Sequence, residues 1–168
     1  MGATTFDTYA LGKTAKEAFG NAVDSALYSY GHDGYTGSIC EKPGFVIFTI
    51  PPGVRCSARR FVDLVGDAEH MSESSYLEGR LQCCKTVSEK RKIEARIRKE
   101  ERMKAAWWRK INPKLVPVIQ RAMPVYRSKW DECIAIEVNG KDAATIKERS
   151  GRKGTHDKVF LFAGWASC

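Results

Sequence analysis

The sequence predicts an α+β fold with one mixed or antiparallel sheet of about five strands. Strand patterns gather towards the two ends of the chain, whereas helical patterns fill its middle. A helix near the N-terminus carries an apolar face that would pack on this sheet. The 168 residues fit a single α+β domain over 1–168. Within it we expect a central, basic helical insertion at about residues 57–124.

The first strand and helix have clear local signals. Residues 4–9, TTFDTY, alternate and are rich in residues that favour strands. A helix is predicted over about 15–30, because apolar side chains recur there at intervals of three and four. Thr14 and Glu17 form a capping box at its start. Gly31 ends it, since glycine adopts the left-handed cap conformation at little cost.

A hairpin is predicted after the glycine-rich loop 31–38. Residues 38–42 form a short predicted strand, Lys-Pro-Gly forms a turn, and 44–50 (GFVIFTI) form the second strand. Pro51-Pro52-Gly53 ends that strand.

The middle of the chain is predicted to be helical. Ser57 is a suitable cap for a helix over about 58–70, and MSESS at 71–75 interrupts it. A second capping box, Ser75 with Glu78, begins a long helix over about 76–111.

Asn112-Pro113 ends that helix and starts a short, irregular one, with proline at the first helical position. Two strands follow, CIAIEV at 133–138 and VFLFAGW at 159–165. Asn139-Gly140 between them is the strongest short turn signal in the chain.

The positive charge is concentrated in one segment. The chain has a net charge of +8. Residues 85–110 hold eleven Lys and Arg against four Glu, a net charge of +7, which leaves +1 for the remainder. Positive charge concentrated in one segment indicates a polyanionic partner more strongly than the same charge spread evenly over the protein.

This basic helix has little apolar surface. Ile93, Ile97 and Trp108 share only a narrow stripe, so the helix should project from the core or lie on its surface. Glu94–Arg98 and Glu100–Lys104 are oriented as i,i+4 ion pairs. The helix could be a solvated face, or it could bind phosphates. The candidate nucleic-acid-binding residues are Lys90, Arg91, Lys92, Arg96, Arg98, Lys99, Arg102, Lys104, Arg109 and Lys110.

Two tryptophans close the basic segment. Trp107 and Trp108 could stack on exposed bases, but a tryptophan at a helix end more often anchors the helix in the core, and we favour that for at least one. No helix-turn-helix, zinc finger or RNP motif is recognisable, which favours backbone binding over sequence-specific reading.

Two loops contain residues that could bind a small ligand. The candidates are His32, Asp33, Tyr35, Thr36, Arg152 and Lys153. Glycine-rich turns are the commoner explanation for such loops. The pairs His32-Asp33 and His156-Asp157 could orient an imidazole, but no nucleophile stands in an elbow motif, and we predict no catalytic residue. The six cysteines form no CxxC pair and no zinc spacing, so we predict no metal and no cofactor.

The location expected from the sequence is the cytoplasm. No run of eighteen apolar residues could span a membrane, and no secretory signal is recognisable at the N-terminus. A projecting, thinly apolar helix could also pair with its own copy, giving a homo-oligomer.

Three stretches carry a resemblance. GATTF (2–6), YGHDGYTGSICEK (30–42) and VFLFAGWAS (159–167) together resemble small bacteriophage proteins of the actinophage type, with their GYTGxIxEK and C-terminal F-x-GWAS motifs. The resemblance implies action inside an infected host cell, in its cytoplasm.

Our leading hypothesis is a non-enzymatic, phage-encoded protein that binds the backbone of DNA or RNA through the basic helix. The alternative is a host-directed inhibitor of a defence system. It would bind a host protein or sequester a small nucleotide ligand.

Overall fold

The structure is a computed structural model that describes residues 2–32, 34–72, 75–84 and 86–168. Its described strands form one mixed sheet in the order β1-β4-β3-β2, flanked by helices. The strands are β1 (Ala3–Gly12), β2 (Phe45–Ile47), β3 (Cys133–Val138) and β4 (Lys158–Ser167). β4 pairs antiparallel with both β1 and β3, whereas β2 pairs parallel with β3. The predicted α+β class is therefore confirmed, with four described strands in place of about five.

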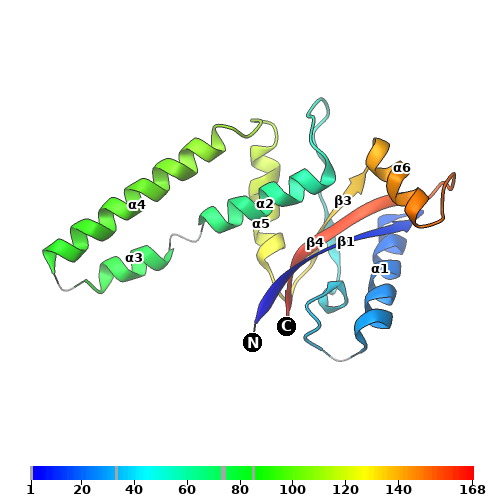
Figure 1. Ribbon diagram of the computed structural model, residues 1–168, viewed down its shortest axis with the longest axis horizontal. Coiled ribbons are helices and arrows are strands. Elements are labelled where there is room, and N and C mark those ends of the chain that lie inside the picture. The colour runs from blue at the N-terminus through cyan, green and yellow to red at the C-terminus, as the bar shows by residue number, and fades with distance from the viewer. Residues whose placement is uncertain (1, 33, 73–74, 85) are drawn as a thin grey trace.

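Helices cover both faces of the sheet, as Figure 1 shows. α1 (Ala15–Tyr30) packs on one face through its buried alanines. α2 (Ala58–Ser72) and α5 (Val116–Arg127) pack together on the other face. The alternating side chains of β4 supply both cores: Val159 and Leu161 face α2 and α5, while Phe160 and Phe162 face α1.

Two further helices form a projecting arm. α3 (Ser75–Gln82) and α4 (Val87–Trp108) lie side by side and extend away from the sheet (Figure 1). We call them the arm.

The predicted long helix 76–111 is in fact two helices. The second begins at Val87 and is capped by Thr86, whose Oγ1 accepts the Glu89 N–H at 3.3 Å and donates to the Glu89 carboxylate at 3.0 Å. Thr86 and Glu89 have the residue types and spacing of a capping box, although the Glu89 carboxylate here accepts the Thr86 hydroxyl, and the predicted long helix did not take this cap into account.

The start of the next helix was also predicted wrongly. α5 begins at Val116 with a proline in its first turn, rather than at Pro113. The Asn112 side chain accepts the Lys114 N–H at 3.0 Å, and the Leu115 N–H bonds the Asn112 carbonyl at 2.8 Å. These local bonds hold a separate turn before the helix.

The predicted hairpin is wrong. Residues 38–42 form a short 3-10 helix, η1 (Ile39–Glu41), and strand 44–50 is reduced to β2, which pairs with β3 instead. The side chains of Thr36, Ser38 and Glu41 bond to one another and to nearby backbone, and such local bonds compete with strand pairing.

The connection between the last two strands also differs from the prediction. Asn139-Gly140 does not form a hairpin turn. Asn139 occupies the N-cap position of α6 (Gly140–Arg149), without a side-chain capping bond, and this helix was not predicted. Ala143 and Ile146 pack this helix against the core, three residues apart on one face.

Candidate nucleic-acid interface

The outward side of α4 carries two adjacent rows of cations. Arg91, Arg98 and Arg102 are separated by seven and four residues, so they follow one line along the helix. Lys92 and Lys99 form the neighbouring row. All five side chains are exposed. We call these five residues the outer cationic surface.

The arginine row of the outer cationic surface is turned away from the buried side of the helix, and the lysine row lies between the two sides. Ile93 is the buried residue of α4 among those described. At about 100° per residue, the arginine row lies roughly opposite Ile93 and spans about 16 Å of helix axis. Glu89 and Glu100 lie on the Ile93 side, and Glu94 and Glu101 lie on one flank, so no glutamate lies between the two cationic rows.

The structure separates the ten candidate residues into groups. Lys90, Arg96 and Lys104 project on the same side as Ile93, and Lys104 is half-buried. Arg96 and Lys92 both line an open groove of about 750 Å³ between α3 and α4, so Lys92 lies where the outer cationic surface borders this groove. Arg109 and Lys110 are exposed just beyond the last turn of α4.

The cations of α4 have no carboxylate partner within the described residues. Neither Glu94–Arg98 nor Glu100–Lys104 forms the predicted ion pair there. By contrast, many cations of the body are paired. The pairs are Arg59 with Asp7 and Asp63, Arg127 with Glu69, Arg152 with Asp157, Lys153 with Glu148, and Lys158 with Glu137. The uncompensated positive field is therefore concentrated on the arm.

The two tryptophans anchor the arm. Trp107 and Trp108 meet edge to face, with centroids 4.9 Å apart, and both pack half-buried against the core under α2 and α5. The anchor interpretation is confirmed for both. Their rings are therefore engaged with the body of the protein rather than left open for bases.

The candidate ligand residues do not come together. Tyr35 and Thr36 lie at the end of the sheet where Gly37 N–H bonds the Ser167 carbonyl at 2.8 Å. Arg152 and Lys153 precede Lys158, which pairs with Gly12 at the other end of the β1–β4 ladder. The two loops therefore lie at opposite ends of the sheet and do not form one shared site. His32 is exposed in the first loop, and Asp33 lies outside the described residues.

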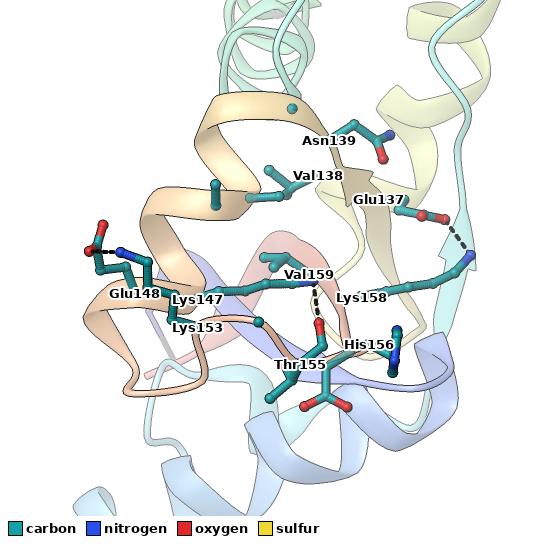
Figure 2. Close-up of a pocket in the computed structure, with 15 residues that line it drawn as sticks. Glu137, Val138, Asn139, Lys147, Glu148, Lys153, Thr155, His156, Lys158 and Val159 are labelled. Atoms are coloured by element: carbon teal, nitrogen blue, oxygen red, sulfur yellow. Dashed lines mark hydrogen bonds and ion pairs between the residues drawn. The ribbon is translucent and has the colours of Figure 1, made fainter.

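The second loop neutralises its own charge, as Figure 2 shows. It borders a hollow of about 490 Å³ beside α6. Each lysine there has a partner. The contacts are Lys153 with Glu148 at 2.8 Å, Lys158 with Glu137 at 3.1 Å, and Lys147 Nζ with the Thr155 carbonyl at 3.2 Å. Arg152 donates to Asp157 at 3.0 Å, so that carboxylate is engaged by arginine rather than orienting His156. Because these cations are already paired within the protein, the loop has little free positive charge to bind a phosphate.

The first loop is organised around one carboxylate. Glu41 accepts the Thr36 N–H at 2.8 Å, the Thr36 hydroxyl at 3.1 Å and the Ser167 hydroxyl at 3.0 Å. Burial alone would raise the pKa of Glu41, but these donors outweigh it and hold the pKa below its ordinary value. The sequence contained the residues of this network without indicating that they meet.

Comparisons with protein-family models, curated proteins and solved structures match nothing to this chain. In the part of the chain that the structure describes, no helix is long and apolar enough to cross a membrane. The same residues include no group of three or more His, Cys, Asp or Glu side chains that could hold a metal ion.

Proposed function

We propose that this protein binds the phosphate backbone of nucleic acid through the outer cationic surface of α4. One observation carries the proposal: two rows of exposed Arg and Lys lie on a projecting helix, without carboxylate partners among the described residues. A polyanion supplies the missing negative charge without disturbing any ion pair of the body.

The dimensions of the surface suit a nucleic-acid backbone. One DNA strand carries a phosphate about every 3.4 Å of axis, so the roughly 16 Å of the arginine row corresponds to about five phosphates. Arginine binds phosphate with two parallel hydrogen bonds, which favours the arginine row as the centre of the contact. The resemblance to phage proteins would place this binding in an infected cell.

The proposal predicts a strong dependence on salt. Five phosphate contacts give a log–log slope of about −4.5 on duplex DNA. Affinity should therefore fall about 500-fold between about 50 and 200 mM salt. Fluorescence anisotropy with labelled single- and double-stranded DNA and RNA measures this slope directly.

A matched pair of triple variants shows whether affinity depends on where the positive charges lie or only on the total charge of the protein. Arg91→Glu, Arg98→Glu and Arg102→Glu together should reduce the slope by about three and weaken binding to all these nucleic acids. The control combines three exposed cations outside the arm. It consists of Lys16→Glu, Arg55→Glu and Lys141→Glu.

The control triple variant has the same net charge as the α4 triple variant but keeps the outer cationic surface intact. It should retain most of the affinity and most of the slope. Equal losses in the two triple variants would show that only total charge matters. Salt-independent binding, or no binding at low salt, would refute the proposal.

A further inference from the structure

Two exposed aromatic rings meet at the end of the sheet opposite α6. Tyr35 is 52% exposed and Trp130 is 57% exposed. Their ring centroids lie 6.4 Å apart and their planes cross at 86°. The two residues come from separate loops, one after α1 and one between α5 and β3. We call this pair the aromatic corner.

The backbone of Tyr35 is held in an unusual conformation. Its φ is 68°, and it is the one non-glycine residue with positive φ in the described chain. This conformation is uncommon and costs about 1 kcal/mol or more in a bulky residue. The N–H of the next residue, Thr36, bonds the Glu41 carboxylate at 2.8 Å, which holds the loop in this shape.

The loop that carries Trp130 is fixed from the same side. Ser128 and Asp131 close a tight turn, with the Ser128 hydroxyl donating to Asp131 at 2.7 Å and accepting its N–H at 3.1 Å. Lys42, only 5% exposed, donates to the Ser128 carbonyl at 2.5 Å. Because Lys42 follows Glu41 directly, one short segment forms hydrogen bonds to both of the loops that carry the two rings.

The shape of the aromatic corner suits a flat ring. Each ring is about half exposed, and the two meet nearly at a right angle, so a planar ligand can stack on one while its edge meets the other. A nucleobase has such a plane, and stacking of bases on aromatic side chains is tolerant of sequence. A base within a duplex is already stacked on its neighbours, so only an unpaired base has its plane available.

We infer that the aromatic corner of Tyr35 and Trp130 binds an unpaired nucleobase of a nucleic-acid strand whose phosphates contact the outer cationic surface. This inference rests on the proposed function and narrows its ligand to single-stranded nucleic acid, or to nucleic acid with unpaired bases. Stacking adds affinity without adding a phosphate contact, so it should leave the salt slope unchanged.

Ring-removing and ring-keeping variants test the aromatic corner. Tyr35→Gly removes one ring and tolerates the positive φ, and Trp130→Ala removes the other. Each should weaken binding of a single strand of about 16 nucleotides by about 5- to 150-fold, which is the range for one stacked base. Tyr35→Phe and Trp130→Phe should retain most of that affinity. Duplex affinity of the same sequence should be unchanged in all four variants.

Tryptophan fluorescence gives a second readout, and its test variant keeps an aromatic ring at position 130. The chain has four tryptophans. Single-stranded nucleic acid should quench the emission of the wild-type protein, and Trp130→Phe should abolish most of the quenching while still binding. Quenching that persists in Trp130→Phe would overturn the inference.

The outcomes distinguish this inference from the proposed function. If Tyr35→Gly and Trp130→Ala, both confirmed as folded by circular dichroism, bind single strands as well as wild type does, the aromatic corner is not a base site. The outer cationic surface would then stand unaffected. Equal losses on single strands and duplex would also overturn the base-stacking inference. If neither nucleic acid binds the wild-type protein, both proposals are refuted.

Discussion

Removal of the Glu41 carboxylate should destabilise the fold, because this group joins the loop after α1 to the end of β4. Glu41→Ala removes the acceptor for the Thr36 N–H, the Thr36 hydroxyl and the Ser167 hydroxyl. Hydrogen bonds to charged groups contribute about 1.5–3 kcal/mol each, but the two hydroxyls can turn to other partners. We therefore expect a loss of about 3 kcal/mol in the free energy of unfolding.

Glu41→Gln is the conservative companion variant. It retains one amide oxygen as an acceptor and replaces the other oxygen by a donor that faces a hydroxyl. The expected loss is about 1–2 kcal/mol. In a chain of this size, each kcal/mol lowers Tm by about 2–4 °C. The Tm should therefore fall by about 6–12 °C in Glu41→Ala and by about 2–8 °C in Glu41→Gln.

The stabilising effect of Glu41 should depend on pH in a defined direction. The pKa of Glu41 in the folded protein lies below its ordinary value of 4.5, so the unfolded chain takes up this proton first as the pH falls. The contribution is complete above pH 4.5 and is lost as the pH falls through the folded-state pKa. The stability difference between wild type and Glu41→Gln should be constant near neutral pH and shrink in acid.

Urea denaturation followed by circular dichroism, at neutral pH and at several acidic pH values, measures these differences. Amide exchange at Thr36 should rise in both variants, because its N–H loses a charged acceptor. Two results would refute the reasoning: a loss below about 0.5 kcal/mol in Glu41→Ala, or a difference from Glu41→Gln that persists or grows in acid.

Three further perturbations have defined outcomes. Thr86→Ala removes the cap of α4 and should weaken that helix by about 1 kcal/mol. Amide exchange should quicken in its first turn while the Tm of the body stays unchanged, and unchanged exchange would contradict the capping role. Burial raises the pKa of Cys133 to about 12, so this thiol should react with a thiol reagent only after unfolding, whereas exposed Cys83 reacts in the native protein. Mass spectrometry of the labelled protein identifies which thiol reacted, and native labelling of Cys133 would contradict its burial. Gly37→Ala places a Cβ 2.6 Å from the Thr4 methyl at a φ of +68°, and should lower the free energy of unfolding by about 1–3 kcal/mol in urea titrations. An unchanged urea midpoint would show that the turn relaxes.

Sequence reasoning succeeded where a local pattern decided the structure. β3 covers 133–138 as predicted, because CIAIEV is a short apolar run that the sheet buries on both faces. α1 begins after Thr14, whose side chain accepts the Glu17 N–H, and is followed by Gly31 with φ of 84°. Capping residues act within a few positions of themselves, so the sequence alone contains their effect.

Sequence reasoning failed at two kinds of position: at local bonds that it did not include, such as those of Thr86 and Asn112, and where residues far apart in the sequence meet. The segment 38–42 contains the 3-10 turn η1, and its Glu41 carboxylate accepts the hydroxyl of Ser167, 126 residues away, in addition to its local bonds. No periodicity within the segment indicates that contact.

For the candidate site, the sequence predicted which segment carries the positive charge. The structure showed that the helix carrying it begins directly after Thr86. The aromatic corner was not predicted as a pair, because Tyr35 and Trp130 are brought together only by the folded loops.

The strand order has a consequence for the rate of folding. β4, the last strand in the sequence, lies between β1 and β3, so β1 has no partner until β4 arrives. Ala3 pairs with Ser167, almost the whole length of the chain away, and closing so large a loop makes the formation of the sheet slow. While β4 is unpaired, the apolar sides of β1 and α1 remain open to other chains. This intermediate is therefore the form of the protein most exposed to aggregation.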